Sequence, residues 1–82
     1  MNLLPTLLLL SITASASQDL FDRAKDLYQH TDYKASLQVI ATDPAPNAAA
    51  HCLTGKNHYM LGDWKQAADS FEQAMTLAPH QR

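Results

Sequence analysis

The chain has few of the residues that support common small scaffolds. Its 82 residues include a single cysteine, so no disulfide framework can form within the chain. Charged residues make up only 17% and the net charge is −2, which does not favour a nucleic-acid-binding face because such a face concentrates basic side chains. Hydrophobic residues make up 46%, a share typical of one small folded domain.

The first sixteen residues carry no charged side chain. Their leucine-rich run is about half of the roughly 20 apolar residues that a membrane-spanning helix needs. It ends in Ala14-Ser15-Ala16, the small-residue pattern that precedes signal peptidase cleavage. The segment therefore predicts a secretory signal peptide over residues 1–16, cleaved before Ser17, and an exported protein in the periplasm or extracellular space. Because no Lys or Arg follows the initiator, a retained packing helix and an uncleaved membrane anchor stay as alternatives.

From Ser17 onward the apolar residues recur with the period of a helix. Leu20, Ala24 and Leu27 stand at i, i+4 and i+7, for example, and no stretch shows strand alternation. The pattern predicts an all-α fold with helices over residues 18–30, 33–41, 47–61 and 64–78.

Residues at the expected helix ends agree with these boundaries. Gly62 follows the third helix, where a left-handed residue commonly ends a helix. Asp63 suits the N-cap of the fourth helix, and Gln66 three residues later completes a capping-box pattern. Asp32 is the corresponding N-cap of the second helix. Such short joints make neighbouring helices antiparallel.

The sequence matches itself when it is shifted by 31 residues. The matched pairs are Lys25 with Lys56, Tyr28 with Tyr59, Asp32 with Asp63, Tyr33 with Trp64, and Lys34 with Lys65. Pro44 and Pro79, which end the two units, lie four residues further apart than this shift. Four residues are about one helical turn, so we expect the second helix of the first unit to be one turn short.

The second unit resembles a tetratricopeptide repeat, a helix–turn–helix motif of about 34 residues. The positions that carry the resemblance are Gly55, Tyr59, Gly62, Asp63, Trp64, Ala67, Phe71, Ala74 and Pro79. His51, Thr54 and His58 depart from the large apolar residues that the family prefers there, and in the first unit Ser36 replaces the usual alanine. The resemblance implies two stacked units, residues 17–46 and 47–79, in a short right-handed α-solenoid, with residues 80–82 as a tail that starts a further helix.

Proteins of this family are binding scaffolds, so the resemblance implies a protein or peptide partner and no catalysis. By analogy the first helix of each unit lines a concave face, formed here by Phe21, Lys25, Tyr28, Gln29, Cys52, Lys56, Tyr59 and Met60. Two lysines and two tyrosines on this face suit an acidic segment. The alternative is that the lysines are merely solvated and the tyrosines pack between helices. The family's lysine clamp for a terminal carboxylate is not reproduced.

No cofactor, metal or nucleic-acid site is expected. His51 and His58 are seven residues apart, about 10 Å along a helix and too far for one ion. Cys52 is expected to act as a small hydrophobic residue, with a reactive or intermolecular thiol as the alternative. The sequence contains no catalytic motif such as Gly-x-Ser-x-Gly. Since about three repeats are normally needed to cover the apolar faces, self-association and a structural role at the start of a longer repeat array stay as alternatives.

Overall fold

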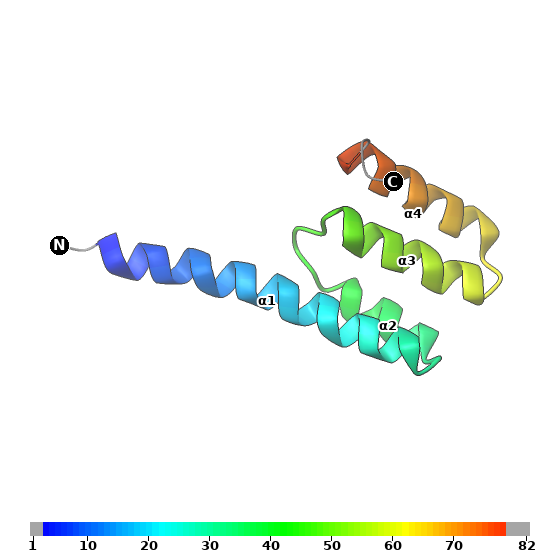
Figure 1. The fold of residues 1–82 in the computed structure, drawn as a ribbon, viewed down its shortest axis with the longest axis horizontal. Coiled ribbons are helices and arrows are strands. Elements are labelled where there is room, and N and C mark those ends of the chain that lie inside the picture. The colour runs from blue at the N-terminus through cyan, green and yellow to red at the C-terminus, as the bar shows by residue number, and fades with distance from the viewer. Residues whose placement is uncertain (1–2, 79–82) are drawn as a thin grey trace.

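The computed structural model describes the backbone of residues 3–78 and the side chains of residues 16–78. Over this range every regular element is a helix, which confirms the predicted all-α fold. The helices are α1 (Leu3–Gln29), α2 (Tyr33–Ile40), α3 (Ala48–Met60) and α4 (Trp64–Leu77). Figure 1 shows two helix–turn–helix units, α1 with α2 and α3 with α4, lying next to each other.

Helix α1 begins at Leu3, so the predicted start at residue 18 was wrong. The leucine-rich run has high helix propensity, and Pro5 is tolerated because it falls in the first turn, where backbone N–H groups have no partner within the helix. The blue N-terminal half of α1 extends beyond the other three helices in Figure 1. No helix in residues 3–78 combines the length and hydropathy needed to cross a membrane.

Helix α2 is six residues shorter than α4, as the predicted ranges 33–41 and 64–78 imply; the proline spacing alone had indicated a difference of only one turn. A local hydrogen-bonded turn follows α2. The Thr42 hydroxyl donates to the carbonyl oxygen of Val39 at 2.7 Å, and the Ala45 N–H donates to the Asp43 carboxylate at 3.0 Å. Pro44 and Pro46, which lack a backbone N–H, disfavour continuation of the helix.

The two turns between paired helices use the same backbone conformation. Gly62 has φ of 83°, as predicted, and Thr31, which corresponds to it in the 31-residue match, has φ of 63°. Asp32 accepts a hydrogen bond from the N–H of Ala35 at 3.4 Å, which confirms its predicted N-cap role. Asp63 makes no side-chain cap bond, so the predicted capping box with Gln66 was wrong. A carboxylate oxygen of Asp63 lies instead 3.4 Å from Nδ1 of His58.

Small residues let the helix pairs approach closely. Ala24 and Ala50 are fully buried beside Ile40 and Leu53 in the core between the units. In the second unit α3 meets α4 at Gly55. A Cβ atom there would lie 2.5 Å from Cε1 of Phe71, so the ring rests directly on the glycine backbone. Ala67 and Ala74, two further repeat positions, are buried on α4. Pro79, the last of these positions, lies outside the described residues.

Thr31 provides a test of the turn geometry. A β-branched residue is strained at positive φ, so Thr31→Gly is expected to raise the free energy of unfolding by about 1 kcal/mol. Thr76→Gly, at an exposed position inside α4, is the matched control and is expected to lower stability. Thermal and urea denaturation measure both changes. A Thr31→Gly variant that loses stability as the control does would contradict this backbone conformation.

Candidate functional site: a groove between α1 and α3

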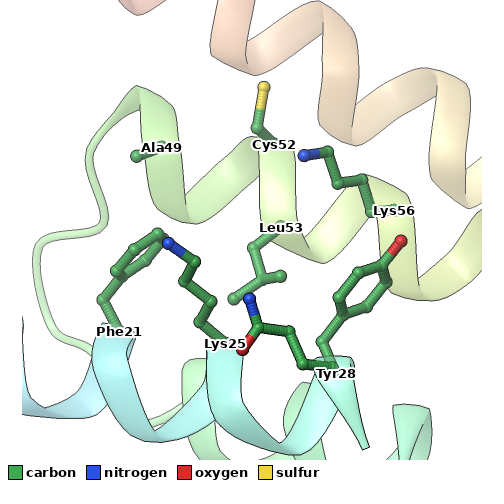
Figure 2. Close-up of a pocket in the computed structure, with 8 residues that line it drawn as sticks. Phe21, Lys25, Tyr28, Ala49, Cys52, Leu53 and Lys56 are labelled. Carbon is green, nitrogen blue, oxygen red and sulfur yellow. The ribbon is translucent and has the colours of Figure 1, made fainter. Parts of the chain in front are cut away.

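A groove of about 400 Å³ runs between the first helices of the two units. Its lining residues are Phe21, Lys25, Tyr28, Gln29, Ala49, Cys52, Leu53 and Lys56. Figure 2 shows Phe21 and Tyr28 rising from α1 on either side of Leu53, which descends from α3. The spacing of the α1 residues explains this arrangement, because positions 21, 25 and 28 lie on one face of a helix.

The groove combines an apolar floor with two exposed cations. Leu53 is buried and Phe21 is half-buried, whereas Lys25 and Lys56 are exposed. Among the described side chains neither lysine forms an ion pair with a carboxylate. Their ammonium groups therefore remain solvated, one on each wall of the groove, where an anionic group would meet positive charge without displacing an existing partner.

The two tyrosines of the 31-residue match are both held by an aromatic neighbour. Tyr28 packs edge-on against Tyr33 with ring centroids 5.5 Å apart, and Tyr59 packs in the same way against Trp64 at 5.1 Å. Each contact joins the first helix of a unit to the start of the second. The contacts support the packing interpretation of the tyrosines, but Tyr59 is still 58% exposed and retains a free surface.

Six of the eight predicted concave-face residues line this groove. Of the other two, Tyr59 lines an adjoining hollow with Tyr28, Lys56 and Phe71, and Met60 lies half-exposed at the end of α3. The Cys52 thiol is exposed, and in Figure 2 it points from α3 away from α1. That these residues bind a ligand stays a prediction.

A buried chain of hydrogen bonds fixes the position of α3 against the first unit. The Ser36 hydroxyl donates to the carbonyl oxygen of Ala24 at 2.6 Å. The Asn57 side-chain N–H₂ donates to the Ser36 oxygen at 2.8 Å and to the carbonyl oxygen of Leu53 at 3.1 Å. Ser36 and Asn57 are both 0% exposed. The chain thus joins α1, α2 and α3, the elements that form and support the groove walls.

Sequence reasoning missed Asn57 as a structural residue and did not place Ala49 and Leu53 in the groove. The available signal was Ser36, a polar residue at a position where the resemblance expects alanine. A polar side chain on a buried helix face requires a partner, and Asn57 lies on the apolar face of α3 with Leu53 and Ala50.

The two histidines of α3 have different surroundings. His58 lies beside Asp63, and His51 is half-buried on the same face of α3. Among the described residues no group of three His, Cys, Asp or Glu side chains is arranged to hold a metal ion.

The family model of the tetratricopeptide repeat matches residues 48–81. The second unit is therefore similar to a tetratricopeptide repeat. The match spans α3 and α4 and covers less than half of the chain. Comparisons with curated proteins and with solved structures give no match. The first unit is related to this repeat by the 31-residue self-match and by the shared helix–turn–helix arrangement.

The hydrogen-bond chain predicts a strong dependence on Ser36. Ser36→Ala leaves the buried Asn57 amide short of a partner and is expected to lower the free energy of unfolding by about 1–3 kcal/mol. Adding Asn57→Leu is expected to recover most of this loss, because Oδ1 of Asn57 already lacks a partner among the described residues. Urea denaturation of both variants measures the effect.

Ser70→Ala is the matched control for Ser36→Ala. Ser70 is half-buried on α4, and the described contacts include no hydrogen bond from its hydroxyl to another helix. We expect the control to change stability little. Equal effects at the two serines would contradict a special role for Ser36.

Proposed function

We propose that this chain is a non-catalytic module that binds an acidic segment of a partner protein in the groove between α1 and α3. Similarity to the tetratricopeptide repeat supports protein–protein interaction in general. The observation that carries the finer proposal is the pair of exposed lysines, Lys25 and Lys56, on opposite walls of an apolar groove.

The groove chemistry favours a segment with both acidic and apolar side chains. Phe21, Tyr28 and Leu53 offer apolar contact, and aromatic anchors of this kind carry much of the energy in protein interfaces. The two lysines favour an acidic segment, because their ammonium groups attract carboxylates and repel basic side chains of a partner. The volume of about 400 Å³ suits a few side chains rather than a folded domain.

We also propose that residues 1–16 act as a signal peptide and that the mature protein is periplasmic or extracellular. The uncharged leucine-rich run and Ala14-Ser15-Ala16 support this. The Ser17 hydroxyl donates to the Asp43 carboxylate at 3.1 Å. Cleavage before Ser17 therefore leaves this contact between α1 and the loop after α2 within the product.

Charge reversal tests the groove. The probe is a fluorescein-labelled peptide of alternating Asp and Leu, and its fluorescence anisotropy reports binding. The Lys25→Glu/Lys56→Glu double variant is expected to weaken binding about tenfold or more, because both walls then repel the peptide. Binding by the unaltered protein is also expected to weaken as salt is raised.

Lys34→Glu/Lys65→Glu is the matched control for the groove variant. These lysines form another pair of the 31-residue match, are exposed, and do not line the groove. We expect this variant to bind within about twofold of the unaltered protein. Equal losses in the two double variants would show that net charge alone drives binding and would overturn the groove assignment.

Processing is tested by the intact mass of the protein recovered after expression in a bacterium that exports proteins. The expected mass corresponds to residues 17–82. An Ala16→Gln variant is expected to keep residues 1–16, because the peptidase pocket admits only small side chains at this position. An unaltered chain that retains Met1 in the cytoplasm would overturn the export proposal.

A further inference from the structure

Within residues 16–78, α3 and α4 of the second unit share an apolar face that no other helix covers. A hollow of about 190 Å³ on this face is lined by Ala48, Cys52, Phe71, Ala74, Met75 and Ala78. Met75 is 69% exposed, and Tyr59, which extends the face past Phe71, is 58% exposed. Large apolar side chains that are more than half exposed and lie together on one surface are typical of an interaction site.

The corresponding surface of the first unit shows what such a face accepts. In the 31-residue match Phe21, Tyr28 and Ile40 correspond to Cys52, Tyr59 and Phe71. In the first unit α3 covers this surface, because Ala50 and Leu53 join Ile40 in one buried cluster against Phe21 and Tyr28. The element that covers the first unit is therefore α3, an amphipathic helix that presents a small residue, Ala50, and three positions later a leucine, Leu53.

A second copy of the chain does not fit the open face in the same way. Helix α1 is the element that would take the place of α3 if copies stacked head to tail. Its residues corresponding to Ala50, Leu53 and Asn57 are Asp19, Asp22 and Asp26, all of them exposed. Stacking would move three carboxylates from water onto an apolar surface, which is strongly unfavourable.

We propose that the face formed by Cys52, Tyr59, Phe71 and Met75 binds an amphipathic helix of a partner protein. The helix presents a small residue and a leucine at i and i+3, as α3 does toward the first unit. At i+7 it presents an apolar residue rather than an amide, because buried Ala67 stands where Ser36 stands in the first unit. Cys52 lines both this face and the lysine-walled groove. The proposal rests on the apolar residues that α4 adds, Phe71 and Met75, and does not depend on the acidic-segment proposal.

The test uses a peptide of residues 47–61 as the partner helix. A hydrocarbon staple replaces Cys52 and Lys56, which are exposed in α3, so that the short peptide is already helical. Asn57→Leu supplies the apolar residue at i+7. We expect the labelled peptide to bind the full chain in a fluorescence anisotropy titration. The control peptide carries Ala50→Asp and Leu53→Asp, which reproduce the pattern of α1, and is expected not to bind.

Variants of the full chain locate the binding surface. Met75→Glu is expected to weaken binding of the stapled peptide about tenfold or more, because it places a charge on the face. Met60→Glu, at an exposed methionine outside this hollow, is the matched control and is expected to change affinity less than about twofold. The Lys25→Glu/Lys56→Glu variant, which reverses the charge of the groove, is measured in parallel, and its effect on the acidic peptide tests the groove proposal independently.

Three results would overturn the proposal. The first is that the stapled peptide binds no better than its aspartate control. The second is that Met75→Glu and Met60→Glu weaken its binding equally. The third is that the chain self-associates in sedimentation velocity and Met75→Glu makes it monomeric, which would show that a second copy occupies the face.

Discussion

One buried chain of hydrogen bonds holds the two helical units in a fixed relation. Ser36 bonds to the backbone of α1 and accepts from Asn57 of α3, and both side chains are fully buried. Apolar contacts around Ala24 and Leu53 alone tolerate small rotations of α3, whereas hydrogen bonds have narrow geometric limits. The separation of α1 from α3, and with it the shape of the groove, depends on these hydrogen bonds of Ser36 and Asn57.

The same surface occurs twice in the molecule and has two different environments. Around Tyr28 it is covered by α3, and the cover forms the core between the units. Around Tyr59 no other helix of the described residues covers it, and Tyr59 is exposed. Among the side chains that the structure describes, the outer face of α1 carries the exposed Asp19, Asp22 and Asp26, whereas the second unit carries the exposed Tyr59 and Met75.

Local signals predicted most of the fold. Helical periodicity and end signals such as Gly62 located the turn between α3 and α4 and three of the four helices within a residue or two. They failed where two local preferences competed. The leucine run continues α1 backward past Ser17, and Asp63 interacts with His58 rather than capping its own helix. Asn57 could not be found from local pattern, because its partner Ser36 is 21 residues away in sequence and comes near only after the helices pack.

The most direct test of this account is hydrogen exchange of the Asn57 side-chain amide, followed by NMR together with its nuclear Overhauser contacts to Ser36. The account predicts that these amide protons exchange as slowly as the most protected backbone amides of α3, because they are fully buried and bonded to Ser36 and Leu53. It also predicts contacts between them and the Ser36 β-protons. Exchange at the rate of a solvent-exposed asparagine, with no such contacts, would contradict a groove whose shape is fixed by the hydrogen bonds of Ser36 and Asn57.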